Sequence, residues 1–308
     1  MGTPDFAVPA LREVAKRCEL VAVVTQPDRP RGRGLEAAAS AVARVAAELG
    51  MNVLKPENPN DEPTRSALAA LGPDLFAVVA FGAILSPALL AVPRLGAINL
   101  HGSRLPQYRG ASPVQRALWD GQSSTGVTTL WMDEGIDTGD IILETSMPIR
   151  DDDDAGSLAA RLAEAGAPLL ADSLVLAHDG QAPRTPQDRA RGSYAKKLGK
   201  QDGVLDWKAG SRQIWNHQRA VTPWPGATAF FRGERIRLER TRIALESGAR
   251  GEPGAVVGVR ESGIEVACGT GTLEIEKLKP EGRSLLEASA WARGARPASG
   301  ERFTSERT

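Results

Sequence analysis

Short apolar runs alternate with stretches of helical periodicity through the first two-thirds of the chain. Residues 20–24, 75–80 and 97–101 are short and apolar, as buried strands are, whereas residues 9–17 and 37–49 have the spacing of helices. Ser112-Pro113 predicts a helix start, because serine is a favoured N-cap and proline a favoured first helical residue. Strands that alternate with helices in this way indicate an α/β domain with a mostly parallel sheet.

The next part of the chain combines a strand pair with a long helix. Residues 128–132 and 141–147 have strand patterns, and residues 133–140 connect them. Residues 157–178 form a long helical pattern, in which Gly166 and Pro168 predict a kink or break near Ala167. Four carboxylates at 151–154 precede this helix, and we interpret them as complementing its N-terminus rather than binding a metal.

The last third of the chain contains several short strands after one helix. A helix is expected over residues 208–219 and a turn over 223–226. The strand patterns lie at 229–231, 235–240, 255–259, 264–267 and 273–278. Closely spaced short strands with glycine-containing turns predict a small β-barrel. Arg235 and Arg237 alternate with apolar residues, which gives one strand a basic face.

The composition indicates an ordinary globular protein with an uneven distribution of charge. The 308 residues are 42% hydrophobic and 25% charged, with no apolar run of transmembrane length and no signal-peptide pattern. We therefore expect a cytoplasmic protein. Its two cysteines and three histidines are scattered, so we expect neither a metal nor a disulfide. We also expect a monomer. Residues 184–200 carry six basic side chains and one acidic side chain, which favours either a solvated linker or a contact with a polyanion.

The candidate chemistry begins with Asn99 and His101 at the end of a predicted strand. Side chains two residues apart in a strand point to the same face, so both can face one reacting carbonyl. Asp137 lies in the connection 133–140, which we expect to deliver it to the same carboxyl ends of the strands. An amide donor, an imidazole and a carboxylate are what acyl transfer to an amine requires. The alternative is that Asn99 closes a turn and His101 is a hydrogen-bonded histidine at a strand end.

The same residues resemble the signature of the folate-dependent formyltransferases, an Asn-x-His at a strand end with an aspartate 36 residues after the histidine (137 − 101 = 36). Further segments are similar to this family in the same order along the chain. They are residues 2–6 (Gly-Thr-Pro-Asp-Phe), 25–34, 101–106 (His-Gly-Ser-Arg-Leu-Pro), 109–115, 132–133 and 137–140. The resemblance implies a Rossmann-like N-terminal domain and a C-terminal OB-like barrel.

The resemblance also implies a reaction and a site. The formyl group of 10-formyltetrahydrofolate would pass to the α-amine of methionyl-initiator tRNA. Asn99 would donate to the oxyanion, and His101, kept cationic by Asp137, would act as electrostatic partner and proton shuttle. The folate is expected along Phe81, Gly82, Ala83, Ile84 and Leu85 and along Ser103, Arg104, Leu105 and Pro106, where the family normally has leucine in place of Arg104. The tRNA is expected at Arg29, Arg31, Arg33, Lys196, Lys197 and Lys200, although the chain after Arg33 is less basic than is usual in the family.

These expectations define the organisation of the chain. We expect a catalytic domain at 1–183, a basic connector at 184–202 and a tRNA-binding barrel at 203–308. Only Met1 precedes the turn that normally follows the central first strand, so we expect a gap in the sheet and a natural protein that begins upstream. Two other functions remain open, a formyltransferase that acts on an amino sugar nucleotide and a non-catalytic RNA-binding relative.

Overall fold

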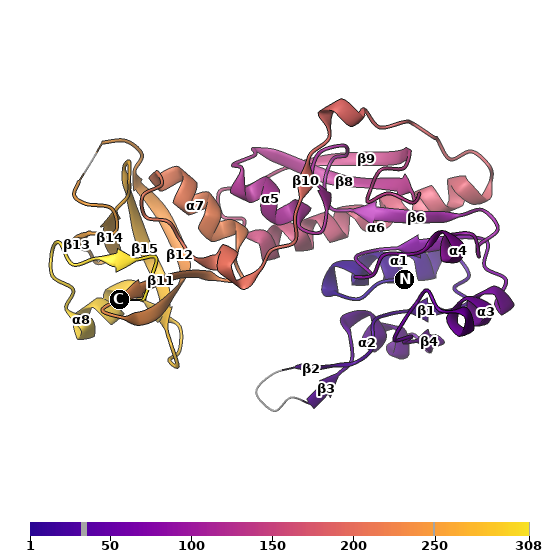
Figure 1. Ribbon diagram of the computed structural model, residues 1–308, viewed down its shortest axis with the longest axis horizontal. Helices are drawn as coiled ribbons and strands as arrows, with labels where there is room; N and C mark the ends of the chain where they lie inside the picture. The colour runs from indigo at the N-terminus through magenta and orange to yellow at the C-terminus, as the bar shows by residue number, and fades with distance from the viewer. Residues whose placement is uncertain (32–35, 249, 308) are drawn as a thin grey trace. The chain divides into compact units, whose positions relative to one another are not determined.

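The computed structural model describes residues 1–31, 36–248 and 250–307, which form two compact units (Figure 1). Unit 1 consists of Met1–Pro113, Ser124–Pro148 and Ala159–Ala195. Unit 2 consists of Val114–Ser123, Ile149–Leu158 and Lys196–Thr308. Each unit has its own sheet. None of the helices formed by the described residues is long and apolar enough to cross a membrane.

Unit 1 is built on a mixed sheet. Its strands are β1 (Val23–Val24), β4 (Val53–Leu54), β5 (Phe76–Val78), β6 (Ala97–His101), β8 (Ser124–Trp131) and β9 (Ile141–Pro148). The pairs β1–β4 and β5–β6 are parallel, as expected for a Rossmann-like domain. The pairs β6–β8 and β8–β9 are antiparallel, with His101 opposite Thr128 and Ile98 opposite Trp131.

Met1 and Gly2 lie between β1 and β5, where a gap was expected. The Met1 amine donates to the Ala77 carbonyl at 2.6 Å, and the Val79 amide donates to the Met1 carbonyl at 2.9 Å. On the other side, the Gly2 amide donates to the Val24 carbonyl at 3.0 Å. Two residues thus satisfy backbone groups of both neighbouring strands, so the expected gap is absent.

The helices of unit 1 and of the segments around it follow the predicted order. They are α1 (Val8–Arg17), α2 (Ala41–Glu48), α3 (Glu62–Ala70), α4 (Pro87–Leu90), α5 (Pro113–Trp119) and α6 (Ala155–His178), with a 3-10 turn η1 (Asp5–Ala7). Helix α2 begins later than predicted, because Ser40 caps it and the preceding β3 (Glu36–Ala38) pairs with β2 (Arg29–Arg31).

Helix α6 is continuous through Pro168, so of the predicted kink or break near Ala167 the break is wrong. Its N-terminus is capped by Asp154, whose carboxylate accepts a hydrogen bond from the Ser157 amide at 2.8 Å. This confirms that the acidic run complements the helix N-terminus. Gly166 serves close packing, because a Cβ there would lie 2.7 Å from a methyl group of Leu100 in β6.

Unit 2 is a closed antiparallel barrel with two helices, α7 (Ser211–Ala220) and α8 (Ala288–Ala295) (Figure 1). Its strands are β11 (Ala227–Phe231), β12 (Glu234–Leu245), β13 (Val256–Val259), β14 (Ile264–Ala267), β15 (Thr272–Pro280), β16 (Leu286–Glu287) and β17 (Phe303–Thr304). They are ordered β13-β14-β15-β12-β11-β17, with β16 on β15. A bridge between Ala255 and Arg302 joins the two ends of this order and closes the sheet. The OB-like barrel predicted for this part of the chain is confirmed.

Candidate active site

Asn99 and His101 lie on one face of β6, as their spacing predicts, and Asp137 joins them there. The carboxylate of Asp137 accepts a hydrogen bond from the Asn99 amide at 3.1 Å and one from the Gly110 backbone amide at 2.8 Å. The Nδ1 atom of His101 lies 3.5 Å from the same carboxylate. The structure therefore brings the three predicted catalytic side chains together.

Asp137 reaches this site by a route that differs from the one predicted. Because β8 runs antiparallel to β6, the loop after Trp131 starts beside Ile98, at the edge opposite to the end of β6 at His101. The loop 133–140 folds back over the face that carries Asn99 and His101. Asp137 has a positive φ of 53°, a conformation that costs a non-glycine residue energy and is found at functional sites.

Both ring nitrogens of His101 face oxygen atoms. Nε2 lies 2.8 Å from the backbone carbonyl of Tyr108, a residue whose φ of 59° is also positive. Nδ1 faces Asp137, and the His101 side chain is only 6% exposed. The site thus presents one oxygen atom to each ring nitrogen. A role for His101 as a proton shuttle requires Nε2 to leave the Tyr108 carbonyl.

The first segment expected to bind folate follows the end of β5, which is parallel to β6. Phe81 and Leu85 are buried in the apolar core of unit 1, so their side chains are not available to a ligand. Gly82 and Ile84 are exposed. The backbone of this segment is held by Asn60, whose amide donates to the Ile84 carbonyl at 2.9 Å. The segment thus presents Gly82 and the Ile84 side chain to solvent, and Asn60 holds its backbone by a hydrogen bond.

The second expected folate segment is fixed by Thr128 of β8. The Thr128 hydroxyl accepts from the Leu105 amide at 3.1 Å and donates to the Ser103 carbonyl at 2.8 Å. Arg104, the departure from the family pattern, lies at the surface, where its guanidinium pairs with Glu144 at 3.1 Å. The bonds that hold the backbone of this segment therefore do not involve the Arg104 side chain. Pro106 ends the segment.

A cavity of about 590 Å³ lies beside Asp137 in unit 1. It is lined by residues of the loop that carries Asp137, by Arg109 and by the exposed Tyr194 of β10 (Tyr194–Ala195), which pairs with β7 (Arg109–Gly110). Cavities of this size accept small molecules or the end of a larger substrate. Sequence reasoning assigned no role to Tyr108, Arg109 or Gly110. The one signal in the sequence was the glycine itself, whose φ of 108° in the structure is a conformation that favours glycine.

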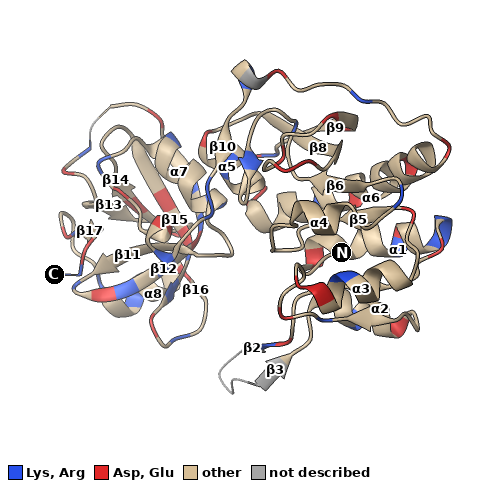
Figure 2. Cartoon of the chain, turned by 45° about the vertical axis from the view of Figure 1, so that its right-hand side comes forward, with Lys and Arg blue, Asp and Glu red and all other residues tan. Residues whose placement is uncertain are grey.

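The residues expected to bind tRNA are distributed over both units. Lys196, Lys197 and Lys200 are exposed at the start of the unit 2 portion that follows β10, and Lys200 begins the 3-10 turn η3 (Lys200–Gly203). Figure 2 shows in blue the positions of lysine and arginine along the chain. Arg29 is exposed in β2. Arg33 lies outside the described residues, and the side chain of Arg31 is not described.

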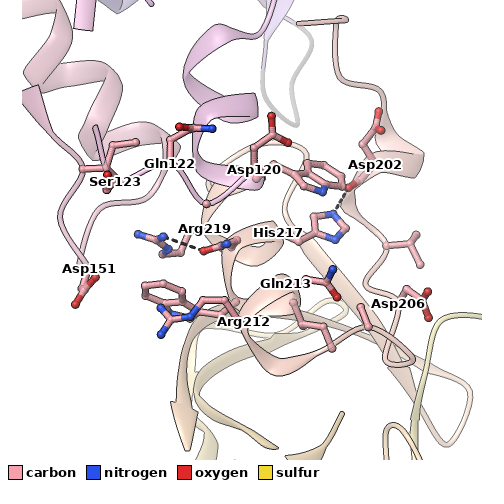
Figure 3. A pocket seen from close by; sticks show the side chains of 18 of the residues that line it. Asp120, Gln122, Ser123, Asp151, Asp202, Asp206, Arg212, Gln213, His217 and Arg219 are labelled. Carbon is pink, nitrogen blue, oxygen red and sulfur yellow. Dashed lines mark hydrogen bonds between the residues drawn. The ribbon is translucent and has the colours of Figure 1, made fainter. Parts of the chain in front are cut away.

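A larger cavity, of about 1030 Å³, lies in unit 2 around helix α7 (Figure 3). His217 stacks on Trp119 at 3.8 Å between ring centroids and faces the Asp202 carbonyl at 2.6 Å. Burial lowers the pKa of His217 below its ordinary value of 6.5, against the opposing effect of Asp202. The guanidinium of Arg116 also lies over the Trp119 ring, 4.7 Å from its centroid. We interpret these contacts as packing that stabilises unit 2.

A Rossmann-like domain with an amide, an imidazole and a carboxylate on one face of its sheet, followed by a small barrel, defines a group-transfer enzyme. Residues 5–174 match the formyl transferase family, and residues 197–296 match the C-terminal domain of formyl transferases. The chain belongs to the formyl transferase family and is therefore a one-carbon transferase.

Similar proteins extend over nearly the whole chain. The methionyl-tRNA formyltransferase of Geobacter metallireducens is 44% identical over 297 residues, which is 96% of this chain and 94% of that protein. The methionyl-tRNA formyltransferase of Moorella thermoacetica is 43% identical, over 96% and 94% of the two chains. An N-formyltransferase from Helicobacter canadensis, solved with folinic acid and dTDP-3-aminofucose, has a TM-score of 0.68 at 18% identity, covering 89% of this chain and 96% of that chain. At this identity the structural likeness supports the fold alone.

Proposed function

We propose that this enzyme transfers the formyl group of 10-formyltetrahydrofolate to the α-amine of methionyl-initiator tRNA and so supports translation initiation. The observation that carries the proposal is the joined site of Asn99, His101 and Asp137 in a chain that is 44% identical to a methionyl-tRNA formyltransferase along almost its full length. Folate ligands in solved relatives, folinic acid in one and tetrahydrofolic acid in HypX from Aquifex aeolicus, support the choice of formyl donor.

The site residues have distinct roles in this reaction. When the neutral amine attacks the formyl carbon, the carbonyl electron pair moves to oxygen. The carbonyl then re-forms, the carbon–nitrogen bond to the folate breaks, and the folate nitrogen takes up the proton that the attacking amine loses. Asn99 uses one N–H for Asp137, and its second N–H can donate to the developing oxyanion. His101 supplies positive charge next to that oxygen. Asp137 holds both side chains in place and balances the imidazolium charge.

Each part of the two substrates can be assigned to a region of the enzyme. We assign the folate to residues 81–85 and 103–106 and the methionyl end of the tRNA to the cavity beside Asp137. We assign the tRNA backbone to the exposed cations Arg29, Lys196, Lys197 and Lys200, together with Arg31 and Arg33. We further propose that the enzyme acts as a monomer in the cytoplasm, where charged tRNA is available.

A competing function is the formylation of an amino sugar nucleotide. A solved enzyme of the same fold, from Helicobacter canadensis, contains dTDP-3-aminofucose in its complex, so we keep this kind of acceptor as the alternative. The basic segment 184–200 and the similarity along the whole chain to methionyl-tRNA formyltransferases favour the tRNA.

Formyl transfer to the two acceptors distinguishes these functions. The enzyme is incubated with 10-formyltetrahydrofolate and either charged initiator tRNA or a dTDP-linked amino sugar, and formylated products are measured by mass spectrometry. We expect formyl-methionyl-tRNA and no formylated sugar, and Asn99→Ala serves as the inactive control. Formylation of the sugar nucleotide without formylation of the tRNA would refute the proposal.

A further inference from the structure

The chain from residue 183 to 195, which we call the strap, connects the loops on both sides of the active site. Its first part is anchored to the hairpin of β8 and β9. The Trp131 indole donates to the Pro183 carbonyl at 3.1 Å, and Thr185 exchanges two backbone hydrogen bonds with Ile141, at 2.9 and 3.1 Å. The strap therefore runs beside the base of the loop that carries Asp137.

The last part of the strap is bonded to the other loop of the active site. The Arg109 amide donates to the Ser193 carbonyl at 2.9 Å, and the Tyr108 amide donates to the Ser193 hydroxyl at 2.9 Å. Gly110 lies so close to Ala195 that a Cβ on the glycine would be 2.9 Å from the Ala195 carbonyl oxygen. This loop supplies the Tyr108 carbonyl to His101 and the Gly110 amide to Asp137.

Gln187, in the middle of the strap, bonds directly to both loops. Its side-chain amide donates to the backbone carbonyls of Asp137, at 2.9 Å, and Gly139, at 2.7 Å. Its side-chain oxygen accepts two hydrogen bonds from the guanidinium of Arg109, at 3.1 and 2.8 Å. Arg109 is only 3% exposed, so these bonds satisfy a buried cation.

These bonds act at a residue of the active site whose backbone has a positive φ. Asp137 has a left-handed backbone conformation, which non-glycine residues rarely adopt without support from their surroundings. The Gln187 amide binds the carbonyl of this same residue. The orientation of the Asp137 side chain toward Asn99, His101 and Gly110 depends on that backbone conformation.

We propose that Gln187, supported by Arg109, is a positioning residue that holds Asp137 in the conformation required for formyl transfer. The inference rests on the proposed function for its kinetic test, because the reaction measured is transfer to charged tRNA. Gln187 does not contact the reacting atoms. It sets the geometry of the carboxylate that does contact Asn99 and His101, and small displacements of such a group cost large factors in rate.

Two substitutions distinguish the hydrogen bonds that Gln187 donates from those that it accepts. Gln187→Glu keeps an acceptor for Arg109 but loses the N–H donors to Asp137 and Gly139. Gln187→Ala loses both the donors and the acceptor. Gln181→Ala is the matched control, because Gln181 is an exposed glutamine of the same unit whose side chain is outside this network. For each variant the kcat and KM for both substrates, the melting temperature, and the amide hydrogen exchange of Gly110 are measured.

The Gly110 amide reports the position of Asp137 without any catalysis, because it donates to the Asp137 carboxylate. We expect both Gln187 variants to lose about 10- to 100-fold in kcat, with each KM within about threefold of the parent. Their Gly110 amides should exchange at least about tenfold faster. Gln187→Glu should melt close to the parent, because its carboxylate pairs with Arg109, and Gln181→Ala should match the parent in every measurement.

A kcat for Gln187→Glu within about threefold of the parent, or unchanged exchange at Gly110, would overturn the proposal. A loss of kcat that follows the melting temperature in both variants would indicate a role in folding only and would also overturn it. Failure of the parent itself to formylate charged tRNA would refute the proposed function, whereas the exchange at Gly110 would still test the position of Asp137.

Discussion

Asp137→Asn is the substitution that most directly removes the charge at the centre of the site. The variant keeps the size of the side chain and one oxygen, but it places an N–H₂ group opposite either the Asn99 amide or the Gly110 amide, both of which are donors. It also leaves His101 without an anionic partner. We expect formyl transfer to fall sharply while the fold is retained.

The size of the effect follows from the geometry. A carboxylate 3.5 Å from the imidazole, with both side chains largely buried, stabilises the cationic ring by about 5 kcal/mol at an effective dielectric constant of about 20. Reorganisation of neighbouring groups and water recovers part of this energy. We therefore expect the barrier to rise by about 3 to 4 kcal/mol, a loss of about 10² to 10³-fold in kcat.

The assay compares steady-state formyl transfer by the parent, Asp137→Asn and the control Asp140→Asn at saturating concentrations of both substrates. Asp140 lies in the same loop, but its carboxylate is outside the hydrogen-bond network of Asn99, His101 and Gly110 described above. The control should retain a kcat close to that of the parent. A kcat for Asp137→Asn within about tenfold of the parent, in a protein with an unchanged melting temperature, would refute this reasoning.

Two further predictions concern RNA affinity and stability. If Lys196 and Lys197 contact phosphates, replacing either with glutamine should weaken tRNA binding and reduce the slope of log affinity against log salt by about 0.7 to 0.9, whereas arginine should retain the slope; a slope that does not change would contradict the contact. Burial alone would raise the pKa of Glu265, but hydrogen bonds, chiefly from Arg260, bring it below its usual value of 4.5. The contribution of Glu265 to the free energy of unfolding is therefore present above pH 4.5 and lost as the pH falls through the lowered pKa. In urea unfolding, Glu265→Gln should lose less unfolding free energy on acidification than the parent, and an equal loss would contradict this assignment. Glu261→Gln, at an exposed neighbouring position, is the control.

The local patterns of the chain predicted most of the elements and half of the site geometry. Alternation along 97–101 was sufficient to place Asn99 and His101 on one face, because the side-chain period of a strand is two. Ser112-Pro113 marked the start of α5 for an equally local reason. The barrel followed from short strands and turns, but its closure through Ala255 and Arg302 depends on pairing between residues far apart in sequence.

The features that sequence reasoning missed are set by tertiary contacts. The path of the Asp137 loop depends on the antiparallel register of β8, which the apolar pattern of that strand does not specify. The continuity of α6 through Pro168 and the backbone pairing of Met1 and Gly2 likewise depend on packing against the sheet. Gln187 stood in a segment interpreted as a basic connector, where one glutamine among arginines gave no local signal of its bonds to Asp137.

The measurement that tests the central claim most directly is single-turnover formyl transfer by His101→Ala, together with its affinity for charged initiator tRNA. His101 faces Asp137 and the Tyr108 carbonyl on the inside of the site, so its loss should remove transition-state stabilisation and leave substrate binding intact. We predict a single-turnover rate at least about 100-fold below that of the parent, with a tRNA Kd within about twofold. A single-turnover rate within about threefold of the parent would contradict the claim that formyl transfer occurs at Asn99, His101 and Asp137.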